Sequence, residues 1–148
     1  MANTETTLIL LKPDAIQRGL CGEILARFER AGLRVLDLRQ VRCTTALLAS
    51  HYAELRTKNR RAFDRTTGYL RGQFVIAVRL SGPNAIAKTR ALLGPTDPVT
   101  APAGTIRGDF SADSTTLADE ENRGTFNLVH AADSPASARR ETRLWFGS

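Results

Sequence analysis

Two spacings of apolar residues alternate along the chain, and the first of them predicts four strands. Runs of β-branched and aliphatic residues, some alternating with charged ones, cover residues 6–12, 33–42, 73–80 and 125–129. The first run stops before Pro13, because a residue that precedes proline is restricted to extended conformations. Lys12 and His130 are therefore each expected at the end of a strand.

The second spacing places apolar residues on one face of a helix. Leu20, Ile24 and Phe28 recur four residues apart and predict a helix over residues 20–31, which Gly32 caps. Further helices are predicted over residues 44–55, over the basic segment before Gly72, over residues 83–93, and from Ser134-Pro135 onward.

The predicted order of elements is β-α-β-α-α-β-α-β-α. Four strands crossed by helices favour an α+β fold, a ferredoxin-like sandwich in which helices pack on a four-stranded antiparallel sheet. Residues 94–110 are rich in glycine and proline and are expected to form an ordered loop. The acidic segment 111–124 extends it as a loop insertion, and residues 1–148 are expected to form a single domain.

The charge of the chain points to an anionic partner. Twenty-one Lys and Arg residues face 15 Asp and Glu residues, for a formal net charge of +6 and a pI of about 10.1. Residues 55–71 hold six cationic side chains and one acidic, whereas residues 111–124 hold four acidic and one cationic. Both runs are typical of solvated surface, and the basic run leaves a nucleic-acid-binding module open.

No segment of the sequence is typical of a membrane span or a secretion signal. The longest uninterrupted aliphatic run covers the four residues Leu8–Leu11, whereas a span needs roughly 20 residues. Two cysteines, Cys21 and Cys43, and two histidines give no spaced metal cluster or disulfide framework. The sequence therefore predicts a cytoplasmic protein without membrane contact and without a metal held by its own side chains.

Phosphate binding, the first chemistry that the charge suggests, must rely on side chains. The chain has neither a GxxxxGK[ST] loop nor a GxGxxG motif, which are the common backbone cradles for phosphate. The candidates are Lys12 at a strand end, and Arg90 and Arg107 in or beside the loop rich in glycine and proline.

His130 and Glu141 are the candidates for covalent chemistry. His130 follows a predicted strand and precedes a helix, where its side chain can face a cleft. Glu141 shares a helical face with Ala138 and Trp145, and an inward carboxylate needs a partner. A histidine held by a carboxylate is fixed in one tautomer, and its other ring nitrogen is free as a nucleophile for phosphoryl transfer.

These residues lie in motifs that resemble the nucleoside diphosphate kinase family over nearly the whole chain. The motifs are Lys12-Pro13-Asp14, Gln17-Arg18-Gly19, Gly104 to Phe110, and Asn127 to His130 with Asp133-Ser134. The resemblance implies a ping-pong transfer of the γ-phosphate of a nucleoside triphosphate, chiefly ATP, to a nucleoside diphosphate through a phosphohistidine. Such a reaction maintains the NTP and dNTP pools.

The resemblance also assigns roles to individual residues. It implies that His130 is the phosphorylated nucleophile, that Glu141 orients it, and that Mg²⁺ arrives with the nucleotide. It implies a homo-oligomer, with a hexamer expected first and a tetramer or dimer next. Phe63 is the aromatic residue left to stack on the base. The family's positions for phosphate and ribose contacts match Lys12, Tyr52, Arg90, Thr96, Arg107 and Asn127. Lys12 is also implied to be catalytic.

Departures from the family pattern leave a second function open. Ala131-Ala132 follows the histidine where the family usually has glycine and serine, and the region of Phe63 has an apparent insertion. A nucleotide-binding regulator with weak or lost turnover is therefore the alternative to an active kinase. The nucleic-acid-binding module is disfavoured, because only Phe63 and Tyr69 interleave aromatic rings with the basic run.

Overall fold

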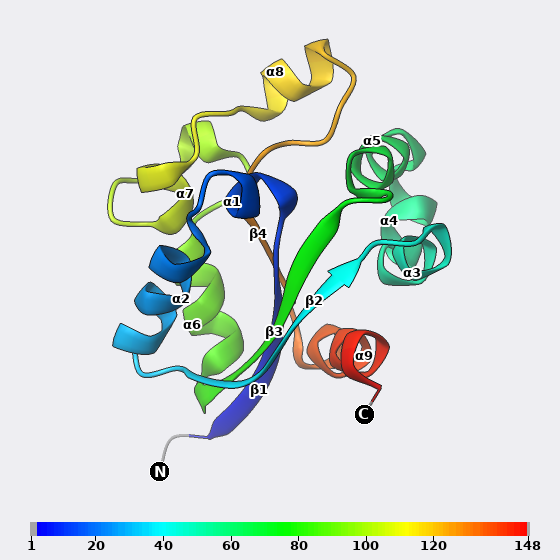
Figure 1. The fold of residues 1–148 in the computed structure, drawn as a ribbon. Helices are drawn as coiled ribbons and strands as arrows, with labels where there is room; N and C mark the ends of the chain where they lie inside the picture. Colours follow the sequence, from blue (N-terminus) through cyan, green and yellow to red (C-terminus); the bar gives the residue numbers. More distant parts are fainter. Residues whose placement is uncertain (1–2, 148) are drawn as a thin grey trace.

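A four-stranded antiparallel sheet forms the centre of the computed structural model, which describes residues 3–147 (Figure 1). The strands lie in the order β2-β3-β1-β4, and every neighbouring pair is antiparallel. The sheet and the helices packed on it confirm the predicted α+β sandwich. The strands are β1 (Thr4–Leu11), β2 (Arg34–Arg42), β3 (Phe74–Pro83) and β4 (Val129–Ala131).

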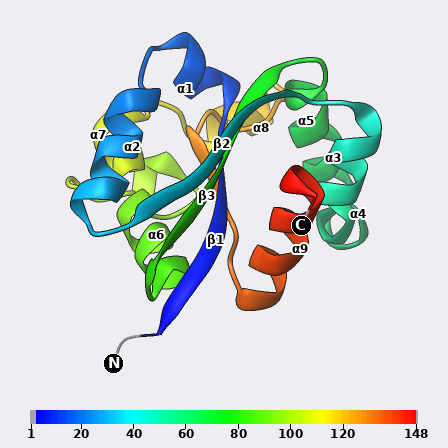
Figure 2. The ribbon, with the colours of Figure 1, turned by 60° about the horizontal axis from the view of Figure 1, so that its bottom comes forward.

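Helices cover both faces of the sheet. Helices α2 and α6 lie on one face, whereas α9 and the group α3 to α5 lie on the other (Figures 1 and 2). The helices are α1 (Pro13–Gln17), α2 (Cys21–Arg30), α3 (Thr45–His51), α4 (Ala53–Lys58), α5 (Arg60–Leu70), α6 (Ala85–Leu93), the 3₁₀ turn η1 (Pro98–Thr100), α7 (Ile106–Phe110), α8 (Thr115–Glu120) and α9 (Pro135–Phe146).

The aliphatic run of β1 serves both layers because successive side chains of a strand point to opposite faces. Ile9 and Leu11 pack with Ile24 and Phe28 of α2. Leu8 and Leu10 belong to a second cluster, which includes Leu48 of α3, Leu70 of α5 and Trp145 of α9. The sheet is therefore buried on both sides along β1, and the end of this strand at Lys12 lies at the junction of the two layers.

The last strand differs from the prediction. It was expected over residues 125–129, but β4 begins at Val129, so His130 lies inside the strand opposite Leu10. Leu128 has a φ of 74°, its N–H donates to Asp14 Oδ2, and its carbonyl accepts from the Lys12 N–H. A left-handed residue cannot continue the ladder, so the segment before it leaves the sheet.

Short helices occupy the segments that were predicted as loops. Residues 94–124 contain η1, α7 and α8, and α1 follows directly after β1. Each of the first three begins at a polar side chain, Asp97, Thr105 or Ser114, which accepts a hydrogen bond from the backbone of its first turn. Helices of this length leave no periodic apolar pattern, which is why the sequence did not predict them.

No helix among residues 3–147 combines the length and the apolar character that crossing a bilayer requires.

Candidate active site

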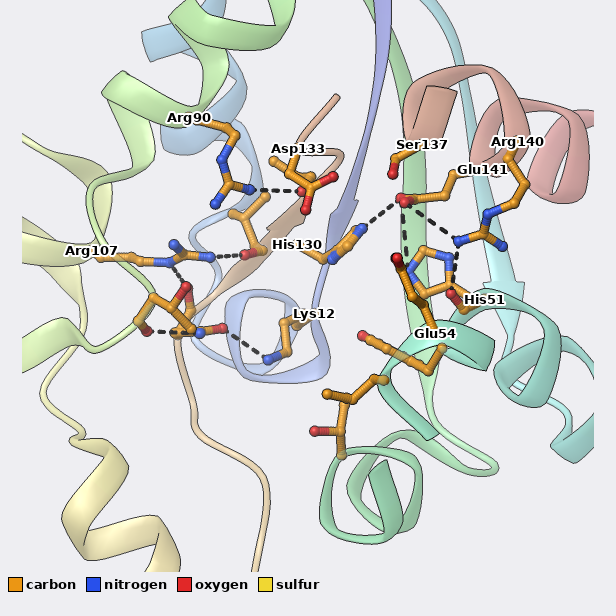
Figure 3. A pocket seen from close by; sticks show the side chains of 17 residues that line it. Lys12, His51, Glu54, Arg90, Arg107, His130, Asp133, Ser137, Arg140 and Glu141 are labelled. Carbon is orange, nitrogen blue, oxygen red and sulfur yellow. Dashed lines mark hydrogen bonds and ion pairs between the residues drawn. The ribbon is translucent and has the colours of Figure 1, made fainter. Parts of the chain in front are cut away.

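A cavity of about 380 Å³ opens where the end of β1, the helices α3 to α5, and the segments around β4 and α9 converge (Figure 3). Among its lining residues are eight of the nine that the sequence nominated: Lys12, Tyr52, Arg90, Thr96, Arg107, Asn127, His130 and Glu141. The exception is Phe63. The fold thus brings together residues that are more than a hundred positions apart in the chain.

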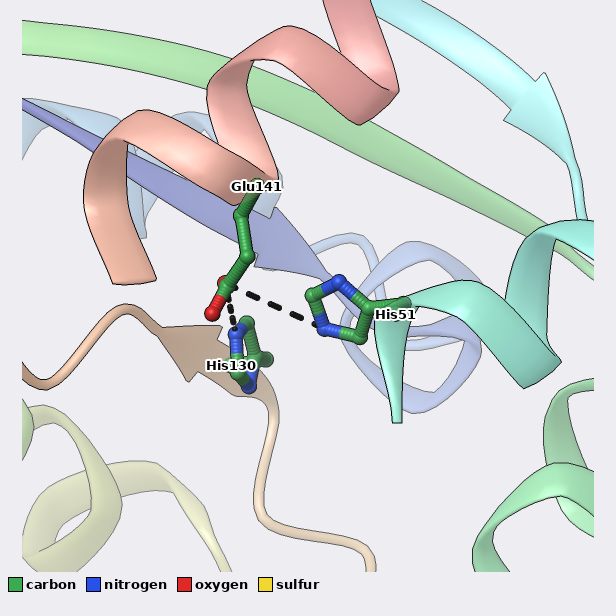
Figure 4. A group of neighbouring side chains, drawn as sticks. All are labelled: His51, His130 and Glu141. Atoms are coloured by element: carbon green, nitrogen blue, oxygen red, sulfur yellow. Dashed lines mark hydrogen bonds and ion pairs between the residues drawn. The ribbon is translucent and has the colours of Figure 1, made fainter. Parts of the chain in front are cut away.

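His130 is held by one ring nitrogen. Its Nε2 lies 2.6 Å from Oε1 of Glu141, which is buried on α9 (Figure 4). An ionised carboxylate only accepts hydrogen bonds, so Nε2 carries the proton and Nδ1 keeps its lone pair. Burial, together with the nearby Lys12, Arg107 and Arg90, holds the pKa of His130 well below its usual value. The ring is therefore neutral at physiological pH, with Nδ1 available as a nucleophile.

His51 lies beside this pair. Its Nε2 is 3.9 Å from Glu141 Oε1, and one nitrogen or oxygen of each of His51, His130 and Glu141 lies within 4.8 Å of the others. Such spacing suits a metal ion, but the chemistry does not. The Trp145 indole N–H donates to His51 Nδ1 at 3.0 Å, so neutral His51 carries its proton on Nε2. Two N–H groups rather than two lone pairs therefore face the carboxylate.

Lys12 is fixed at the end of β1 by the chain that leads to β4. Its ammonium donates to Asn127 Oδ1 at 2.8 Å and to the Thr125 carbonyl at 3.0 Å. Burial lowers the pKa of Lys12 to about 8. An ammonium has three donors, so one N–H remains for a ligand. Because Lys12 is buried, little water competes for that N–H.

Arg107 holds the site together through backbone carbonyls. Its guanidinium donates to Gly94 at 2.9 Å, to Asn127 at 3.1 Å and to Val129 at 2.5 Å. It is buried on α7, and burial followed by the charge of Arg90 lowers its pKa to about 10. Three of its five N–H donors are used, so the remainder can contact an anion while the loop stays fixed.

The remaining nominated residues also line the cavity. Asn127 donates from Nδ2 to the Thr96 carbonyl at 3.0 Å while its Oδ1 holds Lys12. Arg90 donates to the Ala131 carbonyl at 3.1 Å. Burial, reinforced by the charge of Glu141, raises the pKa of Tyr52, which therefore stays protonated as a donor.

Phe63 does not reach the cavity, which corrects the prediction that its ring stacks on a base. Phe63, Thr67 and Leu70 lie on the inward face of α5, and the ring of Phe63 is only 8% exposed. The guanidinium groups of Arg56 and Arg60 lie over it, 5.7 and 5.9 Å from the ring centroid. The position of Phe63 along α5 places its side chain on the buried face of the helix. That side of the cavity is lined by Glu54, Leu55 and Thr66.

The two alanines after His130 occupy ordinary positions. Ala131 pairs with Ile9 in the ladder between β4 and β1, and neither alanine has a positive φ. Ala132 is buried against Ile86 and Ala138. The backbone therefore does not need the conformational freedom of a glycine here, and the position after Ala131 faces the interior of the protein.

Asp14 and Tyr69 are positioning residues that were not assigned a role from the sequence. Asp14 Oδ1 accepts from the Tyr69 hydroxyl at 3.0 Å, and its Oδ2 accepts from the Leu128 N–H at 3.0 Å. These bonds fix the left-handed turn that carries Asn127 to Lys12. Asp14 belongs to the first motif, but its role depends on its burial, since a buried carboxylate requires hydrogen-bond donors.

The acidic segment 111–124 folds back on itself and reaches α5. Arg123 forms two hydrogen bonds to the Asp113 carboxylate, at 2.7 and 2.9 Å. Asp119 on α8 forms an ion pair with Arg65 on α5. The acidic segment and the basic segment therefore neutralise each other in part, which the net charge could not show.

Comparison with known proteins gives one family. The sequence model for nucleoside diphosphate kinase matches residues 5–148. A nucleoside diphosphate kinase of Nocardia farcinica is 44% identical over 97% of this chain and 95% of its own length. One from Pyrobaculum aerophilum is 40% identical over 96% of this chain and 94% of its own.

A solved structure agrees with these sequence matches. The transition-state mimic of the nucleoside-diphosphate kinase of Borrelia burgdorferi, with bound vanadate and ADP, superimposes with a TM-score of 0.93. The two proteins share 32% identity over 97% of this chain and 87% of that one.

Proposed function

The chain belongs to the nucleoside diphosphate kinase family and is a nucleoside diphosphate kinase, and from that premise we propose how its residues carry the reaction. The observation that carries the proposal is the 2.6 Å contact between His130 Nε2 and Glu141 Oε1, which leaves Nδ1 unprotonated. His130 is then the nucleophile, Glu141 orients it, and Lys12 is the catalytic cation.

In the first half of the reaction, the Nδ1 lone pair attacks the γ-phosphorus of a nucleoside triphosphate, chiefly ATP. The bond between that phosphorus and the bridging oxygen breaks, and the oxygen leaves with its electron pair on the diphosphate. In the second half, a terminal oxygen of another nucleoside diphosphate attacks the phosphohistidine and releases Nδ1. The net result is exchange between NTP, NDP and their deoxy forms, which maintains nucleotide pools.

Cationic side chains stabilise the charge of the transferring group. Lys12, Arg90 and Arg107 converge on the cavity from β1, α6 and α7 (Figure 3). Preorganised donors of this kind act most strongly where water is excluded. Tyr52, Thr96 and Asn127 complete the contacts to phosphate and ribose.

Magnesium fits the cavity as a partner of the nucleotide. Mg²⁺ prefers hard oxygen ligands, and the cavity presents the carboxylates of Glu54 and Asp133 apart from that of Glu141. Asp133 is exposed near His130 and would hold the ion together with the phosphates, whereas Glu54 lies at the other end of the cavity. When bound with the nucleotide, Mg²⁺ would neutralise part of the phosphate charge.

A homo-oligomer is part of the proposal. Strand β2 lies at the edge of the sheet, and Leu36, Leu38 and Phe74 near this edge are 44%, 47% and 45% exposed. An open strand edge with apolar side chains can pair with another chain. A hexamer is expected first and a tetramer or dimer next. Size-exclusion chromatography with light scattering tests the oligomeric state. A single species at 16.2 kDa, the mass of the monomer, would contradict a homo-oligomer.

Labelling with γ-³²P-ATP tests the mechanism. The protein should acquire an acid-labile, base-stable label that any nucleoside diphosphate removes as labelled triphosphate. Absence of label on the folded wild-type protein would overturn the assignment of His130.

A further inference from the structure

A hydrogen bond from Trp145 fixes the tautomer of His51. This ring is 3% exposed at the end of α3, and its Nδ1 accepts the indole N–H of Trp145 at 3.0 Å. Burial, followed by the neighbouring His130, lowers the pKa of His51 far below its usual value, so the ring is neutral. Since an indole N–H only donates, the single ring proton must sit on Nε2.

The Nε2–H of His51 lies on the side of the ring that faces Glu141 (Figure 4). Among residues 3–147 the His51 Nε2 has no hydrogen-bond partner, although it is buried. Glu141 Oε1 lies 3.9 Å from it, and this is the same oxygen that lies 2.6 Å from His130 Nε2 (Figure 4). A shift of the carboxylate by about 1 Å would complete a hydrogen bond, given the usual N–H···O range. An unpartnered buried donor is rare, so its direction toward the carboxylate is informative.

Glu141 is buried among charged groups. Burial raises the pKa of this carboxylate, which therefore depends on its neighbours to remain ionised. The titratable and charged groups around it come from α3, β4, α9, α6 and the loop after β4, and are His51, His130, Arg140, Arg90 and Asp133. Arg140 is 3.9 Å from Oε2, and among the described residues His51 and His130 present N–H groups toward Oε1.

The ionisation of Glu141 decides whether His130 can react. An ionised Glu141 accepts from Nε2 and leaves the lone pair on Nδ1. A protonated Glu141 would donate to Nε2 instead, and the ring proton would then move to Nδ1, where it blocks attack on phosphorus.

We propose that His51 is a positioning residue for the phosphoryl transfer: its Nε2–H, fixed by Trp145, keeps Glu141 an acceptor and so keeps Nδ1 of His130 free. The inference rests on the proposed roles of His130 and Glu141. In this role His51 acts through the carboxylate of Glu141 and takes no direct part in the attack on phosphorus.

A packing role is the competing explanation, because the His51 ring also makes edge contacts to Tyr52, His130 and Trp145. Packing predicts lower stability after substitution but no change in the pH dependence of the reaction. The two explanations therefore separate in a pH profile.

The experiment compares His51→Leu with His51→Gln in the full-length protein. The rate of a single turnover of His130 phosphorylation by ATP is measured from pH 5 to 9. In His51→Leu the acid limb should move to higher pH, with a rate at neutral pH reduced roughly tenfold, because the carboxylate loses a neighbouring N–H that favours its ionised form. His51→Gln keeps an N–H donor and should restore most of the rate and the wild-type acid limb.

Leu48→Ala is the matched control. Leu48 is equally buried one turn earlier in α3 and packs against the sheet. This variant should lose thermal stability without any shift of the acid limb. A wild-type acid limb in folded His51→Leu, or equal shifts in the Leu, Gln and control variants, would overturn the proposal.

A measurement on the wild-type protein covers the case in which the variants do not fold. Long-range ¹H–¹⁵N correlation of the two histidine rings should show the proton on Nε2 and a bare Nδ1 in both. A proton on Nδ1 of His51 would overturn the proposal. If His130→Ala still accepts the label, the proposed function fails first, whereas a labelled wild type with unshifted His51 variants refutes this inference alone.

Discussion

The two ends of the nucleotide cavity are built differently. At the phosphate end, Lys12, Arg107 and Glu141 are buried, and each is fixed by hydrogen bonds to backbone or to a neighbouring side chain. At the far end, Glu54 and Thr66 lie on the exposed or half-exposed surface of α4 and α5, and the nearby aromatic ring faces the core. Under the proposed function, the protein therefore preorganises its contacts to the phosphates, which every nucleotide shares, and offers few contacts to the base.

The largest effect is expected when the nucleophile at the phosphate end is removed. His130→Ala should abolish phosphoenzyme formation and lower kcat/KM by at least about 10⁴-fold, as loss of a covalent nucleophile does. Labelling with γ-³²P-ATP and a coupled turnover assay measure it. Binding of ADP, followed by calorimetry, should survive, and its loss would show that the substitution had damaged the cavity itself.

The next largest effect is expected at Lys12. Lys12→Met should reduce kcat/KM about 10²- to 10³-fold, because a preorganised donor to the developing charge is lost. In the wild type, the pKa of about 8 predicts an alkaline limb in kcat/KM, since the ammonium loses its proton as pH rises through that value.

Lys12→Arg tests the origin of that limb. A guanidinium stays protonated, so the decline above pH 8 should disappear even though the absolute rate falls. An alkaline limb that is unchanged in this variant would assign it to another group.

A smaller effect on activity is expected at the base end. Phe63→Ala should lower the free energy of unfolding by about 3 kcal/mol through a core cavity, while KM for ADP stays within about twofold. Thr66→Ala should do the reverse, changing KM modestly and stability by less than about 0.5 kcal/mol. A large rise in KM for Phe63→Ala with stability unaffected would restore the stacking role that the structure does not support.

The smallest effect is expected at Ala131-Ala132, where the departure from the family pattern suggested reduced activity. The double variant Ala131→Gly with Ala132→Ser should leave kcat within about twofold. It should be less stable, because glycine weakens a strand by roughly 0.5–1 kcal/mol and a buried hydroxyl needs a partner. A large gain in turnover would instead favour the regulator with weak activity.

Much of the architecture followed from local patterns. The antiparallel sheet, the helices that start at Thr44 and Ser134, and the strand that carries Lys12 were all predicted, and the caps at both residues are present. The boundaries of β4 were wrong by several residues. Its start depends on the bond between Leu128 and Asp14, which are 114 positions apart, so no local pattern contains it.

The class of fold, the nucleophile candidate and the cations around it could be predicted from local patterns, because these depend on strand and helix periodicity and on side-chain chemistry at motif positions. Only the tertiary structure decided that Phe63 turns inward, that the acidic segment docks on α5 through Arg65, and that Trp145 fixes the proton of His51. The physical reason is that burial and tautomer are set by partners far away in the chain. A residue's identity limits which hydrogen bonds it can make, and the packing of the elements selects among them.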